Sequence, residues 1–304
     1  MYKMCARICI SLLLGSCLAA AADTAQPRAN LSAAEIVAKN VAARGGLEAW
    51  RAVKTISLSG KMGVGGNQRA TLQVPTSLSG AVSRQNGQPI LPSRPAEERY
   101  FPFLLELARP HKRRFELQFA GQTAIQVYDG VQGWKLRPYL NRRVVEAFTE
   151  GELKISAAQP DLDGPLVDYQ AKGTQVELAG MEKVEGRDTY KVKMTMQNGQ
   201  SLHVWIDAQT FLEAKIEGQP RTLDGTEHPV EVYFRDYRAV NGLKIPFVLE
   251  TRVLPVKKTA TGLRDVPVPP EEIIIDKATV NPKFDEALFS KPEATLSAAA
   301  RQTR

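Results

Sequence analysis

Hydrophobic and polar residues alternate along this chain with two different periods, and the first is helical. After a polar leader, apolar residues recur at helical spacing over 36–42, and Ser32 and Glu35 occupy the two positions of a capping box. Gly45-Gly46 then ends the segment, because glycine adopts positive φ without strain. The pattern predicts a helix between Ser32 and Gly45 and a second short helix over Leu47 to Ala52.

From residue 56 onward the period changes to two, which is typical of strands with one covered face. Asn198-Gly199 and Asn241-Gly242 are strong hairpin signals between such strands. A long series of consecutive antiparallel strands usually curls to protect its edges, which predicts a barrel or half-barrel. The strands are expected around residues 56–62, 114–119, 125–127, 134–137, 189–196, 202–207, 212–216, 232–234, 245–249 and 273–275.

Three stretches interrupt the strand pattern. Residues 64–97 are rich in proline and glycine, which indicates a long, poorly ordered insertion or a loose hairpin. Residues 100–105 fit either a short helix or an edge segment. Residues 149–170 begin with a second capping box and contain two prolines, so short helices are expected there. A last short helix carries Leu288 and Phe289, and the tail 291–304 is expected to be loose. Residues 23–290 are therefore predicted to form a single domain.

The first 22 residues have the order of a secretory signal. Lys3 and Arg7 precede an apolar run over Ile8–Leu14, and small residues follow up to Ala22. Cleavage after Ala22 would release a periplasmic protein. Leu14-Gly15-Ser16-Cys17 also fits a lipobox, in which Cys17 would be lipidated and would anchor the chain in the bacterial envelope.

Composition adds limits on the chemistry. All three cysteines lie in the signal segment, so no disulfide is expected in the mature chain. The net charge of +7 falls by two when Lys3 and Arg7 are removed. A mildly basic exported protein can meet a membrane surface or stay soluble. The densest basic cluster, His111 to Arg114, is interpreted as a solvated strand edge or turn, and no nucleic-acid motif is present.

The titratable residues do not form a recognisable catalytic or metal site. The three histidines are far apart in sequence, and there is no HExxH, GxSxG or phosphate-loop motif. Asp161 and Asp163 are interpreted as part of a turn that caps a helix, Asp207 as support for a hairpin turn, and Asp236 as a surface ion pair. We therefore expect no enzyme activity, no catalytic residues, no metal and no cofactor.

One aliphatic face of the predicted sheet is a candidate ligand-binding surface. Methionines adapt to irregular apolar shapes, which suits flexible acyl chains. The alternative is an ordinary core packed against the helices. The candidate residues are Tyr190, Val192, Met194, Met196, Leu202, Val204 and Ile206.

Several short sequence fragments spread over the chain are similar to those of one known group of proteins. They are Gly45-Gly46-Leu47-Glu48-Ala49, Leu166-Val167-Asp168-Tyr169, Val176-Glu177-Leu178-Ala179-Gly180, Val184-Glu185-Gly186, Trp205-Ile206-Asp207, Asp236-Tyr237-Arg238, Asn241-Gly242-Leu243-Lys244-Ile245-Pro246 and Asn281-Pro282. Together they resemble the LolA/LolB-like family of periplasmic lipoprotein carriers, and more closely the broader outer membrane lipoprotein-sorting-like proteins. The resemblance excludes residues 64–97.

The resemblance implies a mainly β (α+β) fold: a strongly curved antiparallel sheet that forms an unclosed barrel, with short helices covering its open mouth. It also implies a monomeric carrier that binds the acyl chains of lipids or lipoproteins on the concave face. This chain is longer than those carriers, and no functional arginine of the family is carried over onto its residues. The alternative function is an envelope protein-interaction or sensory module on the same fold.

Overall fold

The computed structural model describes residues 31–64, 84–85, 88–89, 99–119, 121–138, 142–223, 225–257, 259–260, 262, 265 and 267–293. Residues 84, 85, 88, 89 and 142 are described by their backbone alone. The predicted signal segment 1–22, with the candidate lipidation site Cys17, lies outside the described residues. So do most of the insertion 64–97 and the end of the tail, residues 294–304.

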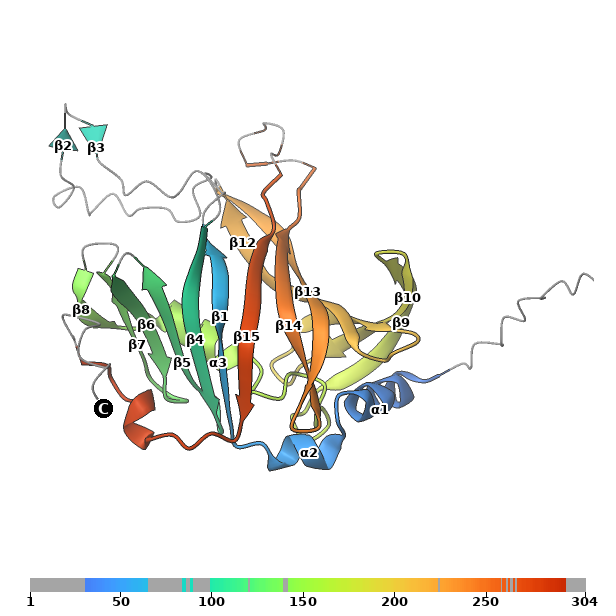
Figure 1. The fold of residues 1–304 in the computed structure, drawn as a ribbon. Helices are drawn as coiled ribbons and strands as arrows, with labels where there is room; N and C mark the ends of the chain where they lie inside the picture. The colour runs from blue at the N-terminus through green and yellow to red at the C-terminus, as the bar shows by residue number, and fades with distance from the viewer. Residues whose placement is uncertain are drawn as a thin grey trace, which may run out of the picture. The chain divides into compact units, whose positions relative to one another are not determined.

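The chain begins with two short helices and continues mainly as strands (Figure 1). The helices are α1 (Ala33–Ala43), α2 (Leu47–Ala52), α3 (Glu150–Ala158) and the 3-10 helix η3 (Glu286–Phe289). The strands before α3 are β1 (Thr55–Val64), β2 (Arg84–Gln85), β3 (Gln88–Pro89), β4 (Arg99–Ala108), β5 (Lys112–Phe119), β6 (Gln122–Tyr128), β7 (Gly133–Arg137) and β8 (Arg142–Ala147). Those after α3 are β9 (Gln175–Val184), β10 (Arg187–Thr195), β11 (Ser201–Asp207), β12 (Glu213–Leu223), β13 (Thr226–Val240), β14 (Leu243–Val253) and β15 (Glu271–Val280).

Within the described residues, thirteen strands form one antiparallel sheet in the order β8-β7-β6-β5-β4-β1-β15-β14-β13-β12-β11-β10-β9. The two ends of the chain's strand series, β1 and β15, pair with each other in the middle of this order. The sheet curves strongly, but β8 and β9 at its two ends do not pair, so it stays open. The predicted fold is confirmed: a mainly β, unclosed barrel whose mouth is covered by short helices (Figure 1).

The turn between α1 and α2 packs against the hairpin between β13 and β14. The capping box of Ser32 and Glu35 starts α1, as the sequence predicts. Gly45 then has a φ of +118°, and an added Cβ would lie 2.6 Å from the carbonyl oxygen of Gly242. The backbone N–H of Lys244 also donates to the carbonyl of Arg44 at 2.9 Å. Helix α1 and the strands are therefore held in close register by backbone contacts.

The structure corrects two sequence predictions. Residues 100–105 are neither a helix nor an edge segment, because they belong to β4, between β1 and β5. A proline is tolerated in this inner strand because Pro102 lies just beyond Phe103, where the pairing with β5 begins. Residues 162–167 form turns rather than a second short helix after α3. Strand β8, which the sequence did not indicate, forms one end of the sheet.

Separate apolar clusters fill the two halves of the curved sheet. In the half that includes β4 to β7, Phe289 of η3 is 3% exposed and packs with a cluster of residues from these strands, Ala108, Ile125, Val127 and Leu136. In the other half, the apolar stripe of α1 is buried and α1 contacts β9. Within the described ranges, no helix has both the length and the apolar character needed to cross a membrane.

Candidate functional site

A cavity of about 320 Å³ lies between strands of the sheet and the turns that follow α3. This volume is at the lower end of the range for small-molecule sites, about 300–1,000 Å³. Its wall is mainly apolar, with a few charged and polar groups. The lining residues from helices and strands are Arg44, Leu105, Leu107, Arg113, Glu213, Phe234, Tyr237 and Pro246. Those from the turns after α3 are Gln159, Pro160, Asp161, Leu162, Gly164 and Pro165.

The turns that cover the cavity belong to what we call the α3 segment, residues 150–173, and α3 itself contributes no lining residue. Its first part, α3, has no buried residue, and Ile155 is 55% exposed. The contacts that tie α3 to the sheet are polar: Lys135 pairs with Glu152, and Arg113 donates to the carbonyl of Ser156 at 3.2 Å. Because few apolar contacts hold it, α3 is the most weakly attached part of this segment.

The second part of the α3 segment is firmly anchored. Leu166 and Val167 have no exposed surface. Asp168 forms a two-bond ion pair with Arg51 of α2, at 2.7 and 2.9 Å. The hydrogen bond from Arg51 lowers the pKa of Asp168 below its usual value. The α3 segment therefore consists of a weakly attached helix, α3, followed by turns that are firmly anchored.

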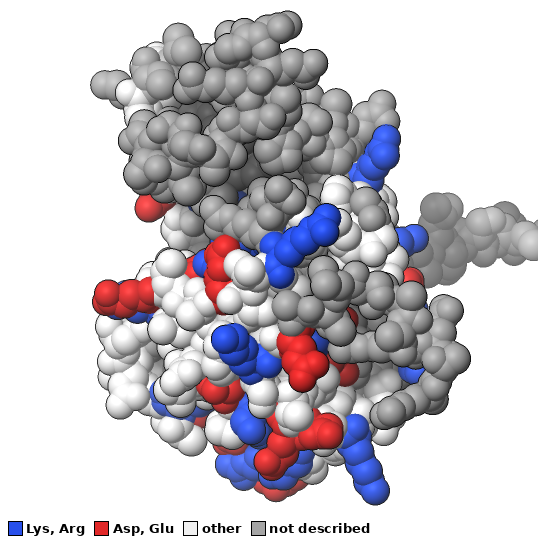
Figure 2. Space-filling view, turned by 90° about the vertical axis from the view of Figure 1, so that its left-hand side faces the viewer, with Lys and Arg blue, Asp and Glu red and all other residues white. Residues whose placement is uncertain are grey.

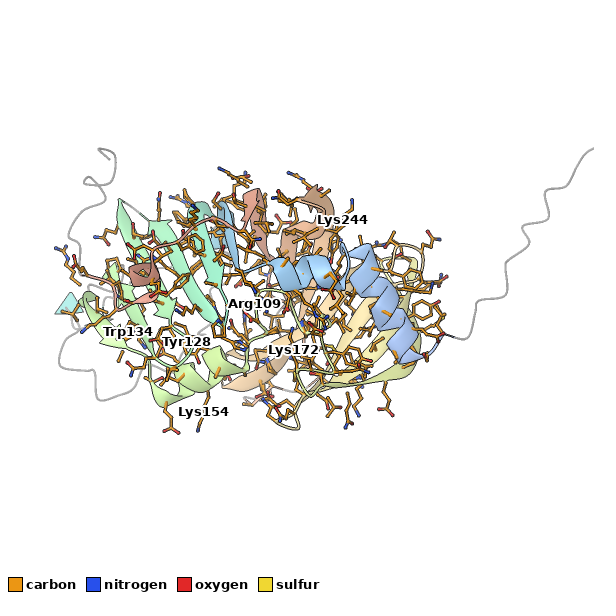
Figure 3. The ribbon with its side chains drawn as sticks, turned by 90° about the horizontal axis from the view of Figure 1, so that it is seen from below. Arg109, Tyr128, Trp134, Lys154, Lys172 and Lys244 are labelled. Atoms are coloured by element: carbon orange, nitrogen blue, oxygen red, sulfur yellow. The ribbon has the colours of Figure 1, made fainter. Side chains whose placement is uncertain are left out.

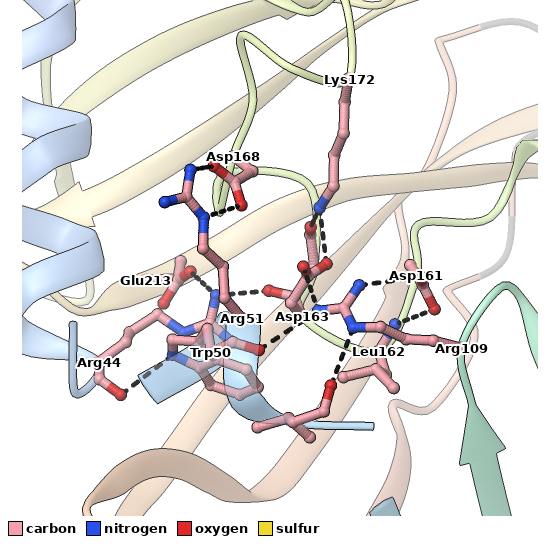
Figure 4. A network of polar contacts seen from close by, with 12 residues as sticks. Arg44, Trp50, Arg51, Arg109, Asp161, Leu162, Asp163, Asp168, Lys172 and Glu213 are labelled. Atoms are coloured by element: carbon pink, nitrogen blue, oxygen red, sulfur yellow. Dashed lines mark hydrogen bonds and ion pairs between the residues drawn. The ribbon is translucent and has the colours of Figure 1, made fainter. Parts of the chain in front are cut away.

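Arg109, at the end of β4, connects the sheet to the base of the α3 segment (Figure 4). Its guanidinium lies 3.0 Å from Asp161 Oδ2 and 2.7 Å from Asp163 Oδ2, and Nε donates to the carbonyl of Val53. Lys172 Nζ contacts the other oxygen of Asp163 at 2.6 Å. Burial alone would lower the pKa of Arg109, but the bonds and charges of the two aspartates outweigh it and raise that pKa.

Arg44, just after α1, forms a second link to the same turn. Its Nη1 donates to the carbonyl of Asp163 at 3.1 Å and pairs with Glu213 Oε1 at 3.2 Å. The hydroxyl of Tyr237 donates to the carboxylate of Glu213 at 3.1 Å. Burial raises the pKa of Tyr237 well above its usual value, so it is a neutral donor. The guanidinium of Arg44 also stacks over the Trp50 ring, 4.5 Å from its centroid.

The arrangement of these groups is seen from below in Figure 3. Helix α3 lies on one side of the mouth, α1 and α2 lie on the other, and Arg109 and Lys172 lie between them. Lys154, on α3, points away from the sheet and is 76% exposed. On the side of the molecule that carries β5 to β8, acidic and basic side chains are intermixed (Figure 2). The described residues on that side therefore present no patch of a single charge.

The structure places the seven predicted ligand-binding residues on β10, β11 and the turn between them. The register pairs Tyr190 with Ile206, Val192 with Val204, and Met194 with Leu202. None of the seven lines the cavity. Four of them have no exposed surface, Val192, Met194, Val204 and Ile206, and Tyr190 is 7% exposed. Their role in ligand binding stays a prediction, and most of them are covered by protein as core residues are.

The charged residues of the site were missed or misinterpreted in the sequence. Asp161 and Asp163 cap no helix: Asp161 supports a turn by accepting from the N–H of Leu162, and both pair with Arg109. Of the basic cluster His111 to Arg114, His111 lies in an exposed turn, as one of the two interpretations had it, but Arg114 is 5% exposed and Arg113 lines the cavity. A possible signal was the presence of charges in strands whose alternate positions are apolar.

The interpretations of Asp207 and Asp236 agree with the structure. Asp207 Oδ1 accepts from the N–H groups of Gln209 and Thr210, which supports the hairpin turn. Asp236 pairs with Arg238 at the surface. Among the described residues, no three side chains of histidine, cysteine, aspartate or glutamate are close enough to hold a metal ion. The expectation that this protein has no catalytic residues stays a prediction.

Comparisons with known proteins concern the fold. No protein-family model matches the chain, and no curated protein matches its sequence. Among solved structures, the chain is similar to an outer membrane lipoprotein-sorting protein domain from Vibrio parahaemolyticus, with a TM-score of 0.46 and 13% identity over 85% of this chain and 96% of that chain. It is also similar to a LolA superfamily protein from Nitrosomonas europaea, with a TM-score of 0.46 and 10% identity over 85% and 97%.

A third similar structure is a DUF1329 family protein from Desulfovibrio piger, with a TM-score of 0.44 and 11% identity over 84% of this chain and 95% of that chain. At these identities the likeness is one of fold.

Proposed function

We propose that this protein binds the acyl chain of a lipid or lipoprotein and carries it within the bacterial cell envelope. The observation that supports the proposal is the mainly apolar cavity between the sheet and the α3 segment. Leu105 and Leu107 line it and are only half-buried, so their side chains face space that a hydrocarbon chain can fill. Each buried methylene contributes about 0.8 kcal/mol to such binding.

The structure of the cover is suited to loading and release. The base of the α3 segment is anchored by Leu166 and by the ion pairs of Arg109, so it would stay in place. Helix α3 is held by polar contacts and can move away at a lower cost. A carrier needs both properties, because its ligand must be shielded in transit and then given up.

The proposal is tested by uptake of a fluorescent fatty acid, together with native mass spectrometry of the purified protein. Leu107→Trp places a larger side chain in the cavity wall and should weaken uptake at least about tenfold. Leu178→Trp is the matched control, because Leu178 lies on the edge strand β9, is 40% exposed and does not line the cavity. An absence of both bound lipid and fatty-acid uptake would overturn the proposal.

A periplasmic location belongs to the same proposal and depends on cleavage of the predicted signal after Ala22. Cleavage before Cys17 would instead give a lipid-anchored protein. Mass spectrometry of the mature N-terminus distinguishes the two.

A second candidate function is protein interaction, and the edge of the sheet favours it. In the part of the chain that the structure describes, β9 is the last strand of the sheet, and one side of its backbone has no neighbouring strand. Leu178 and Met181 on this strand are 40% and 39% exposed. A partner can add a strand to such an edge. Envelope extracts would be tested for a protein that the wild type captures and that Leu178→Lys with Met181→Lys does not.

A further inference from the structure

Of the described residues, one cation of the cavity wall has no ion pair. The charged residues that line the cavity are two cations and two carboxylates, Arg44, Arg113, Asp161 and Glu213. Both carboxylates are paired with other cations, Glu213 with Arg44 and Asp161 with Arg109. Arg113 has no ion-pair partner among the described residues.

Arg113 is costly to hold in this position without a counter-ion. It lies on β5 and lines the cavity, and burial lowers the pKa of its guanidinium, although the charge of Asp161 offsets part of this effect. Its described hydrogen bond is the one from Nη2 to the carbonyl of Ser156 in α3, at 3.2 Å. The centroid of the Tyr128 ring lies 6.0 Å from the guanidinium carbon. An arginine has five N–H donors and stays charged, so most of its bonding capacity is unused.

The unused N–H groups of Arg113 are open to contact. Three buried side-chain atoms of the described residues have no hydrogen-bond partner, and they belong to Asn40, Arg44 and Arg137. The nitrogens of Arg113 are not among them, so those without a partner keep some accessible surface. A ligand in the cavity can therefore reach the guanidinium.

The wall beside Arg113 is apolar. Arg113 pairs across the strands with Leu107, which is two positions from Leu105, and both leucines line the cavity. A volume of about 320 Å³ is small for a ligand site and suits one slender chain. The site thus combines one available cation with a narrow apolar space.

We propose that the cavity binds a single-chain amphiphile with an anionic head group, a carboxylate or a phosphate, held by Arg113 while the tail lies against Leu105 and Leu107. This inference rests on the proposed function and adds the class of its ligand. A carboxylate or phosphate can take two parallel N–H bonds from a guanidinium, which supplies the missing counter-charge. Recognition then depends on the head group as well as on the apolar tail.

The test compares ligands that share a tail and differ in charge. Binding of dodecanoate, dodecyl phosphate and the uncharged dodecanol is measured by displacement of a fluorescent fatty acid from the purified protein at neutral pH. We expect at least one anionic ligand to bind about tenfold more tightly than dodecanol, because bonds to charged groups are the stronger ones. The order of the two anions identifies the source, a fatty acid or a phosphate-bearing lipid.

Variants then assign the preference to Arg113. Arg113→Gln should remove the advantage of the anion and leave dodecanol binding within about twofold, whereas Arg113→Lys should keep part of it. Arg238→Gln is the control for the loss of one charge, because Arg238 is 53% exposed and pairs with Asp236 at the surface. It should leave the preference unchanged.

Three outcomes would overturn one or both proposals. Equal binding of dodecanol and both anions would overturn the head-group inference and leave the proposed function standing, and so would an unchanged preference in Arg113→Gln. Absence of bound lipid together with failure of the fluorescent fatty acid and of all three ligands to bind would overturn both. If Arg113→Gln does not fold, the wild-type protein still tests the inference. Its preference for an anionic ligand over dodecanol should decrease at high salt, because screening weakens attraction between charges.

Discussion

Arg109 and Asp163, which are 54 positions apart, meet at 2.7 Å across the mouth of the curved sheet. Arg109 directly follows β4, and Asp163 belongs to the turns that line the cavity. The Asp163 side chain is 3% exposed, whereas that of Arg109 is 24% exposed. A buried carboxylate therefore fixes the cover to the sheet through a cation that keeps some contact with water.

Removal of this carboxylate charge should destabilise the protein strongly. Asp163→Asn leaves Arg109 and Lys172 without their shared counter-ion, and such a loss at a buried pair costs about 3 kcal/mol. The partial exposure of the two cations keeps the cost at the lower end of the range. Unfolding in urea, followed by circular dichroism, measures the change in the free energy of unfolding.

Glu48→Gln provides the control for Asp163→Asn. Glu48 pairs with Arg51 but is 82% exposed, so the variant should change the free energy of unfolding by less than about 0.5 kcal/mol. Equal effects of the two substitutions would show that Asp163 is not the anchor we describe.

Acid should destabilise the protein partly through Glu185, on the outer surface. The hydrogen bond from Arg235, helped by Arg252, lowers the pKa of Glu185 to about 2 from a usual value of 4.5. A lowered pKa in the folded state stabilises the protein above pH 4.5, and this contribution is lost as the pH falls toward 2. Glu185→Gln should therefore reduce the slope of stability against pH between about pH 5 and pH 2.

Urea midpoints measured in steps from pH 7 to pH 3 would check this dependence. Glu177→Gln is the matched variant, because Glu177 is 78% exposed and its pair with Lys193 is 3.8 Å long. Its profile should follow that of the wild type. The prediction fails if Glu185→Gln and the wild type lose stability in parallel as acid is added.

Substitution of two adjacent glycines distinguishes the cost of backbone strain from the cost of a steric clash. Gly46 has a φ of +93° and no atom within 4 Å of an added Cβ, so Gly46→Ala costs strain alone, about 1–3 kcal/mol. Gly45 has a φ of +118°, and its Cβ would also lie 2.6 Å from Gly242 O. Gly45→Ala should therefore cost at least about 1 kcal/mol more. Thermal or urea unfolding of both variants measures the difference, and equal losses would contradict the close approach of the hairpin.

Much of the fold could be predicted because local signals and the final structure agree. The capping boxes at Ser32 and Thr149 begin α1 and α3, and Asn198-Gly199 and Asn241-Gly242 lie in hairpin turns. The curvature of the sheet followed from the number of strands. Local signals did not show which segments, distant in the sequence, become neighbours in the sheet. Residues 100–105 lie inside the sheet because β1 and β5 flank them, and neither partner is visible from the segment itself.

The site was harder to predict than the fold because its charges come from distant parts of the chain. Arg113 and Asp161 resemble surface residues when each is considered with its sequence neighbours. They line one cavity only after β5 and the turns after α3 meet. The apolar pattern of Val192 and Val204, by contrast, indicated a covered face correctly but could not show whether helices or a ligand cover it.

The attachment of α3 to the sheet gives the last prediction. Lys135 is 5% exposed and pairs with Glu152, which also completes the capping box of α3. Lys135→Met removes the tie but keeps the helix capped, and a methionine fits a buried position. Peptides covering residues 150–158 should therefore exchange their amide hydrogens several-fold faster, whereas those of β13 and β14 should be unchanged. In the control Lys154→Met, whose lysine is 76% exposed, exchange should match the wild type. Faster exchange throughout the sheet in Lys135→Met would mean that this pair stabilises the whole fold rather than the cover.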